Sequence, residues 1–261
     1  MDDRTAGKFW EANAETWTLL AHEGWDVYRD AVNTPAFFRL LPDVSGQRGL
    51  DIGCGEGSNT RALARRGALM WALDIAPTFI RAAECEERLL PLGIRYLAAS
   101  AHHLPFPAEC FDFVTAFMSL MDMPAVESVL LEVRRVLRPG GFFQFSITHP
   151  FFDMPRRKQL SDGEGRPVAF EVAGYFEPGG VSVDQWMFSS IPEQRRRGLT
   201  PFRVPRFRRP LAAWLNALCA AGFLLERTAE PCADEETARR VPTVADTRLI
   251  PYFLHVRCRK P

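Results

Sequence analysis

The stretch LDIGCGEG at residues 50–57 constrains the fold more than any other part of the chain. It joins an apolar run to a segment of helical composition, and it has glycine at positions 53, 55 and 57. Glycine accepts positive φ and lets a ligand approach the backbone closely. Open α/β sheets bind ligands at the carboxyl ends of their strands, beside the free N–H groups of a following helix. We therefore expect a ligand site between the first strand and the helix after it.

Apolar runs and helical segments alternate along most of the chain. We expect helices within 58–67, 77–93, 124–140 and 209–223, and strands at 48–53, 68–74, 94–99, 111–120, 142–148, 224–230 and 252–258. Strands that alternate with helices imply a parallel sheet covered by helices on both faces. The predicted fold class is α/β, with a doubly wound, mostly parallel, seven-stranded, Rossmann-like sheet.

The alternation is interrupted after the fifth strand. Residues 150–209 are rich in Pro, Gly, Arg and aromatic residues and show no sustained period, which is typical of a functional insertion. We predict an N-terminal helical cap at 1–41, a ligand-binding core at 42–149, an inserted substrate lid at 150–209 and the rest of the core at 210–261. The cap and the lid are expected to fold over the carboxyl edge of the sheet.

Composition limits the partners and the compartment. Lys plus Arg and Asp plus Glu both number 32, so the net charge is zero and argues against nucleic acid and anionic membranes as partners. No apolar run is long enough to span a bilayer, and the N-terminus does not resemble a signal peptide. The six cysteines show no metal-binding spacing. We expect a cytoplasmic monomer or homodimer that binds no metal.

Two aspartates indicate which ligand the glycine loop binds. Asp74 ends the second strand, where a carboxylate can accept hydrogen bonds from a ribose diol. A dinucleotide fingerprint needs a glycine or alanine where this chain has Ser58. Asp51 beside the loop suits a ligand with a cationic or amino group better than a pyrophosphate. Both details favour S-adenosylmethionine over a nicotinamide dinucleotide.

The same residues resemble the class I S-adenosylmethionine-dependent methyltransferases, in their methyltransferase type 11/25-like, small-molecule branch. LDIGCGEG is similar to motif I, ASAHHLPFPAECFDFV to the adenine-binding segment, and VLRPGGFFQFS to the turn before the fifth strand. The resemblance is close over 49–148 and looser over 210–260. It implies that the cofactor, later released as S-adenosylhomocysteine, is bound by Asp51, Gly53, Cys54, Gly55, Asn59, Asp74, Ile75, Ser100, Ala101, His102, Phe117 and Met118. One departure is Ser100, which stands where the family often has an aspartate that bonds the adenine amino group.

Methyl transfer from a sulfonium is an in-line displacement, so positioning and exclusion of water supply most of the rate. His149 follows the fifth strand and is the candidate general base, with a structural histidine as the equal alternative. The aromatic lid suits a planar or apolar small-molecule acceptor. We expect the substrate pocket to include Trp17, Asp122, Phe151, Tyr175 and Trp186.

Two other functions fit parts of the sequence. An RNA or protein methyltransferase would use the basic and aromatic stretch between Arg195 and Arg209. The end of the fourth strand lacks the [N/D/S]PP[Y/F] tetrad of amino-group DNA and RNA enzymes, and no Pro-Cys nucleophile follows. A non-catalytic module that binds S-adenosylmethionine is the second alternative.

Overall fold

The core of the protein is one seven-stranded sheet in the order β10-β11-β5-β4-β1-β2-β3. The strands are β1 (Arg48–Ile52), β2 (Leu69–Asp74), β3 (Arg95–Ala98), β4 (Phe111–Phe117), β5 (Leu137–Thr148), β10 (Leu224–Ala229) and β11 (Phe253–Arg259). β11 runs antiparallel to both of its neighbours, and the pairs from β5 to β3 are parallel. The computed structural model describes residues 1–177 and 181–261. The predicted fold class, a mostly parallel α/β sheet, is confirmed.

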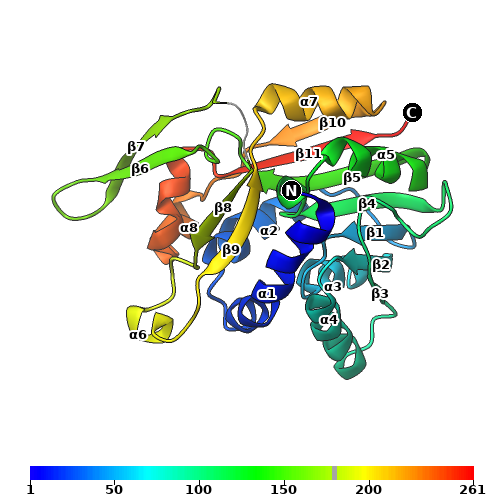
Figure 1. Cartoon of the computed structure of the whole chain (residues 1–261), viewed down its shortest axis with the longest axis horizontal. Coiled ribbons are helices and arrows are strands. Elements are labelled where there is room, and N and C mark those ends of the chain that lie inside the picture. Colours follow the sequence, from blue (N-terminus) through cyan, green and yellow to red (C-terminus); the bar gives the residue numbers. More distant parts are fainter. Residues whose placement is uncertain (178–180) are drawn as a thin grey trace.

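Helices cover both faces of this sheet (Figure 1). They are α3 (Ser58–Ala64), α4 (Pro77–Leu89), α5 (Val126–Val136) and α7 (Leu211–Ala220). α5 buries its apolar stripe with Trp214 of α7 in the larger hydrophobic core. α3 and α4 contribute Leu63 and Ile80 to a second core around Met70 of β2. These two cores hold the carboxyl ends of β1, β2 and β4 in fixed positions.

The boundary between α5 and β5 differs from the prediction. α5 ends at Val136, and RPGG belongs to β5, which begins at Leu137. Leu137 pairs with Phe111 of β4 whereas Phe142 pairs with Phe113, so residues 138–141 bulge out of the ladder. The extra residues explain why a strand starts directly where the helix stops.

The N-terminal segment (residues 1–41) is helical and contains α1 (Asp3–His22), the π-helix η1 (Arg29–Asn33) and α2 (Thr34–Leu40). Asp2 caps α1 by accepting a hydrogen bond from the Thr5 N–H at 2.9 Å. α1 packs against α4 and against β9 (Phe202–Phe207), and it lies in front of the sheet in Figure 1. The segment therefore covers the ends of the strands that hold the glycine loop.

The inserted segment (residues 150–209) is more regular than its sequence predicts. It forms two antiparallel hairpins, β6 (Arg156–Ser161) with β7 (Pro167–Ala173) and β8 (Val181–Trp186) with β9, and a short helix α6 (Glu193–Arg196). The β6–β7 hairpin projects from the body of the molecule in Figure 1. The short helix η2 (Leu120–Asp122) follows β4, and α8 (Glu235–Arg240) and η3 (Pro242–Arg248) lie between β10 and β11. The sequence did not predict these last two helices.

Candidate active site

A cavity of about 910 Å³ lies at the carboxyl edge of the sheet. Its walls come from the glycine loop, the ends of β2 and β4, the N-terminal segment and both hairpins of the inserted segment. Ligand sites of small molecules have volumes of roughly 300–1,000 Å³. Of the residues that the sequence assigns to the site, the cavity is lined by Trp17, Gly53, Cys54, Gly55, Asn59, Asp74, Ile75, Ala101, Phe117, Met118, Asp122 and Trp186.

The glycine loop is shaped by backbone conformations that other residues rarely adopt. Gly53 has φ +67° and Gly55 has φ +55°. A Cβ on Gly53 would lie 2.4 Å from the Cβ of Ser119, which follows β4, whereas a Cβ on Gly55 would meet no atom within 4 Å. Gly53 is thus required by the packing of the loop against β4, and Gly55 leaves open space beside the backbone.

Asp74 fixes this loop to the end of β2. Its carboxylate accepts hydrogen bonds from the N–H of Gly55 at 3.0 Å and of Ala76 at 2.9 Å. Burial raises the pKa of Asp74 to about 6, although these backbone hydrogen bonds lower it. The group lines the cavity, so a ribose diol bound there would meet a carboxylate whose position is already set.

Asp51 has a different role from the predicted cofactor contact. It is buried, and its two oxygens accept hydrogen bonds from the hydroxyls of Thr60 at 2.6 Å and Thr115 at 2.8 Å. It does not belong to the described lining of the cavity. Both oxygens join β1 to α3 and β4, and a direct contact of Asp51 with the cofactor stays a prediction.

Ser100 and His102 also lie behind the cavity wall and not on it. The Ser100 hydroxyl donates a hydrogen bond to Asp3, and the backbone N–H of His102 donates to the Ser100 hydroxyl at 3.0 Å. The His102 ring contacts the hydroxyl of Ser128 at 2.7 Å. Asp3 itself lines the cavity. Ser100 and His102 thus hold the carboxylate of Asp3, and their own contacts with a cofactor stay predictions.

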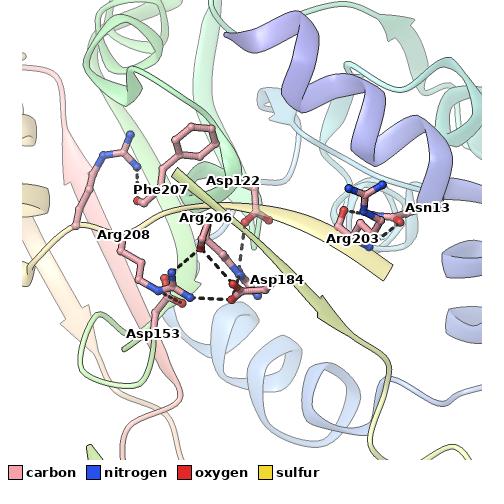
Figure 2. Close-up of polar contacts among 10 residues, drawn as sticks. Asn13, Asp122, Asp153, Asp184, Arg203, Arg206, Phe207 and Arg208 are labelled. Carbon is pink, nitrogen blue, oxygen red and sulfur yellow. Dashed lines mark hydrogen bonds and ion pairs between the residues drawn. The ribbon is translucent and has the colours of Figure 1, made fainter. Parts of the chain in front are cut away.

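A chain of charged residues also lines the cavity, and Figure 2 shows the contacts within it. Arg206 of β9 contacts Asp122 at 3.3 Å and Asp184 of β8 at 3.5 Å. Arg208 continues the chain to Asp184 at 2.8 Å and to Asp153 at 3.7 Å. Burial, together with the nearby Asp153 and Asp184 charges, raises the pKa of Asp122 to about 7, although Arg206 opposes the shift.

Comparison with known proteins assigns the family. Residues 50–145 match the family model for a methyltransferase domain. A crystal structure of an S-adenosylmethionine-dependent methyltransferase from Mesorhizobium loti superposes with a TM-score of 0.70 at 28% identity, over 86% of this chain and 96% of that one. The chain contains a methyltransferase domain of the class I S-adenosylmethionine-dependent type. The family predicted from the sequence is thereby confirmed.

Two curated relatives of this methyltransferase are named for small-molecule acceptors. The fatty-acid O-methyltransferase of Mycolicibacterium smegmatis is 36% identical over 50% of this chain and 50% of its own length. The ubiquinone biosynthesis O-methyltransferase of Methylococcus capsulatus is 33% identical over 48% of this chain and 56% of its own. The chain thus matches only about half the length of these relatives. Among the described helices, none is both long and apolar enough to cross a membrane.

His149 does not lie at the floor of the methyltransferase cavity as predicted. Its Nδ1 accepts a hydrogen bond from the Phe151 N–H at 3.0 Å, and its Nε2 lies 2.9 Å from a carboxylate oxygen of Glu230. Burial lowers the pKa of His149, and Glu230 opposes that shift. The imidazole is not part of the described cavity wall. It joins the end of β5 to the residue after β10, which favours the structural role that the sequence left open beside that of a base.

Phe151 and Tyr175 lie outside the main cavity as well. Their rings are 6.4 Å apart, and the Tyr175 hydroxyl accepts a hydrogen bond from the Leu211 N–H at 2.9 Å. Tyr175 lines a separate cavity of about 210 Å³ between the inserted segment and the start of α7. Both residues attach the inserted segment to the core, so they are not part of the predicted pocket.

Aromatic side chains form two walls of the main cavity. Trp17 of α1 packs edge-on against Trp186 at 5.5 Å and Phe188 at 4.9 Å between ring centroids. On another side, Tyr252 stacks on Phe152 at 3.8 Å. Trp17 and Trp186 were predicted, and Phe152 belongs to the aromatic lid that the sequence predicts as a wall of the pocket. Tyr252 was not assigned to the pocket, because an aromatic residue before a strand is common in any core.

Several polar lining residues were missed by the sequence interpretation. They are Asp3, Asp26, Arg29, Asn33, Glu56, Asp153, Asp184, Arg206 and Arg208. Arg29 and Asn33 lie at the two ends of η1, a helix type that is frequent at functional sites, and Arg29 contacts Glu56 at 3.0 Å. The sequence does contain a signal for Arg206, which alternates with Phe202 and Val204 along β9 as residues of one strand face do. Arg208, just after the strand, continues this spacing.

The arginine-rich stretch is used inside the molecule. Arg195 pairs with Glu23 at 2.8 Å, Arg206 and Arg208 form the charged chain, and Arg209 donates a hydrogen bond to the backbone of Phe207 at 3.0 Å. Arg197 keeps 78% of its side chain exposed. Pairing of this kind leaves less positive charge for a polyanion than the sequence indicates.

Proposed function

We propose that this protein binds S-adenosylmethionine at the glycine loop and Asp74 and transfers its methyl group to a small-molecule acceptor. The observation that carries the proposal is the shared cavity: Asp74 and Gly55 line the same space as the charged and aromatic residues of the inserted segment. A donor and an acceptor bound in the same closed space can react in line. Family membership supports the choice of donor.

The residues on the cofactor side fit the chemical groups of this donor. The Asp74 carboxylate would accept hydrogen bonds from the ribose hydroxyls, and Gly53 and Gly55 would let the backbone approach the amino-acid part. Met118 follows β4 with φ +53°, a strained conformation for a residue with a side chain, and such strain is typical of functional sites. When bound, S-adenosylmethionine supplies an electrophilic methyl group on a sulfonium whose leaving group is a neutral thioether.

Asp122 is the group placed to receive a proton from the acceptor. It lines the cavity at the end of β4 and has one ion pair, to Arg206, at the long distance of 3.3 Å. Its other oxygen accepts no hydrogen bond from the described part of the chain. With a pKa raised to about 7 by burial, the carboxyl group can take up a proton near neutral pH. Asp122 therefore replaces His149 as the candidate base.

The walls of the acceptor side favour a molecule with a flat or apolar part. Trp17, Trp186 and Phe188 form one aromatic surface, and Phe152 and Tyr252 form another. The two relatives named for fatty-acid and ubiquinone biosynthesis methylation agree with an apolar acceptor. The internal pairing of Arg195, Arg206 and Arg208 disfavours the RNA alternative.

Isothermal titration with S-adenosylhomocysteine tests cofactor binding. The wild type should bind, and Asp74→Ala should bind about 10- to 150-fold more weakly because a charge-assisted hydrogen bond contributes roughly 1.5–3 kcal/mol. Glu84→Gln, on the exposed face of α4, is the matched control and should bind as the wild type does. NADH should not displace S-adenosylhomocysteine. Tight NADH binding, or undiminished binding by Asp74→Ala, would refute the assigned cofactor site.

Transfer of a labelled methyl group tests the acceptor class. Purified enzyme is incubated with labelled S-adenosylmethionine and, separately, with a small-molecule extract and with total RNA. We expect label in organic-soluble products only. Label in RNA that is lost when Arg195, Arg196 and Arg197 are replaced by alanine would support the alternative function.

A further inference from the structure

The lining of the cavity next to Asp74 is mainly apolar, as a site for a purine base requires. Ala99 follows β3 and donates a backbone hydrogen bond to the carbonyl of Asp74 at 3.0 Å. A nucleoside whose ribose is held at Asp74 could place its base beside Ala99, which this backbone hydrogen bond brings next to Asp74. This part of the cavity, the slot, is lined by apolar groups at Ala6, Gly7, Ile75, Ala99 and Ala101.

α1 closes this slot because Gly7 permits a very close approach. A Cβ at Gly7 would lie 2.9 Å from Cδ1 of Ile75, the residue directly after Asp74. The contact brings the first turn of α1 against the end of β2. Asp3, one turn before Gly7 on the same helix, thereby reaches the cavity.

The carboxylate of Asp3 is held in place by the loop after β3. The Ser100 hydroxyl donates to one of its oxygens, and the Nε2 atom of His102 lies 3.6 Å from the other. Ser100 is fixed in turn by the backbone N–H of His102 at 3.0 Å, and the His102 ring by Ser128 at 2.7 Å. Ser100, which lies 97 positions after Asp3 in the chain, thus orients the Asp3 carboxylate at the edge of the apolar slot.

We propose that Asp3 accepts a hydrogen bond from the 6-amino group of the adenine and so selects a 6-amino purine over a 6-oxo purine. An ionised carboxylate only accepts hydrogen bonds, so it attracts an exocyclic amino group and repels a carbonyl oxygen at the same position. Ser100 is a positioning residue that acts through Asp3. The inference rests on the proposed function, because it assumes that the nucleoside occupies the site at Asp74.

Two ligands that differ at one purine position test this role. S-adenosylhomocysteine and its 6-oxo analogue, S-inosylhomocysteine, are titrated by calorimetry into the wild type, Asp3→Asn and the control Glu15→Gln, which removes an exposed carboxylate from the same helix. The wild type and the control should prefer the adenine ligand by roughly tenfold to a hundredfold. Asp3→Asn should abolish most of this preference, because an amide can also donate to the 6-oxo group.

A second pair of variants separates recognition from folding. Ser100→Ala should reduce the preference without changing the far-ultraviolet circular dichroism. Asp3→Glu keeps a carboxylate at the same position of α1 and should keep most of the preference that Asp3→Asn loses. An Asp3→Glu variant that folds but binds both purines equally would overturn the role of the carboxylate at position 3.

The failure of this inference is distinguishable from failure of the proposed function. If the wild type binds neither ligand, the S-adenosylmethionine site itself is refuted. If the wild type binds S-adenosylhomocysteine but Asp3→Asn keeps the full preference over the 6-oxo analogue, only the role of Asp3 is refuted.

Discussion

The Nη1 atom of Arg206 lies 3.3 Å from Oδ1 of Asp122, which joins the inserted segment to the end of the central strand β4. Both side chains are largely buried, with 12% and 4% of their surfaces exposed. Asp184 contacts the guanidinium group of Arg206, and Asp153 contacts that of the neighbouring Arg208. Asp122 therefore lies near other negative charges as well as beside its positive partner. The ionisation of Asp122 therefore affects how stably the inserted segment is held against the end of β4.

The first prediction concerns the pH dependence of stability. Burial raises the pKa of Asp122 from 3.8 to about 7, so the folded protein binds a proton that the unfolded chain releases between these values. The stability gained from this proton is full below pH 4 and is lost as the pH rises through 7. Asp122→Asn should therefore gain on the order of 2–3 kcal/mol relative to the wild type between pH 5 and pH 8. Urea unfolding at both pH values measures this difference.

Other buried carboxylates, including Asp51 and Asp74, titrate in both proteins and cancel in the comparison. Glu84→Gln serves as the control and should differ from the wild type by the same small amount at both pH values. A difference between Asp122→Asn and the wild type that is independent of pH would contradict the raised pKa.

The second prediction compares two glycines of the loop. Gly53→Ala combines a positive φ with a Cβ that would lie 2.4 Å from the Ser119 Cβ, so it should lower the free energy of unfolding by about 2–5 kcal/mol. Gly55→Ala carries the backbone strain alone and should cost about 1–2 kcal/mol. Chemical denaturation of both variants provides the measurement. Equal losses would show that Ser119 moves aside without cost.

The third prediction concerns closure of the cavity. We expect S-adenosylhomocysteine to slow hydrogen exchange in residues 1–41 and 150–209, since both segments line the site. The Asn13 side chain donates to the Arg203 carbonyl at 3.0 Å and accepts from the Arg203 N–H at 3.1 Å (Figure 2). Asn13→Ala should therefore speed exchange in both α1 and β9. Protection confined to residues 50–120, in either protein, would mean that these segments do not close over the ligand.

The parts of the fold that were predictable have strong local patterns. α5 buries valines and leucines at helical spacing, and β1 and β2 end in the glycine loop and Asp74, so pattern and chemistry agree there. The inserted segment was harder, because β8 and β9 are short hairpin strands whose alternation is interrupted by Pro205 and by charged residues on the inner face. In the sequence alone, its arginines are typical of an exposed surface, because their carboxylate partners lie in other parts of the chain.

The differences between the expected and the observed surroundings of the site residues come from contacts between distant parts of the chain. His149 has the sequence position of a base, but its partner Glu230 lies 81 residues later and holds it away from the cavity. The sequence shows no carboxylate near Ser100, but α1 places the carboxylate of Asp3 next to it. Such pairings depend on how whole elements pack, so the local sequence around each residue does not predict them.

The paired hydrogen bonds between Asn13 and Arg203 have a consequence for turnover. They join α1 to β9, so we expect these two elements to open as one unit. We also expect the proposed cofactor to be the more enclosed of the two ligands, because Gly7 brings α1 directly onto Ile75. An enzyme of this form should follow an ordered sequence in which the methylated product departs first and S-adenosylhomocysteine last. Its rate at saturating substrate would then be set by the escape of the spent cofactor, which would act as a potent competitive inhibitor against fresh donor.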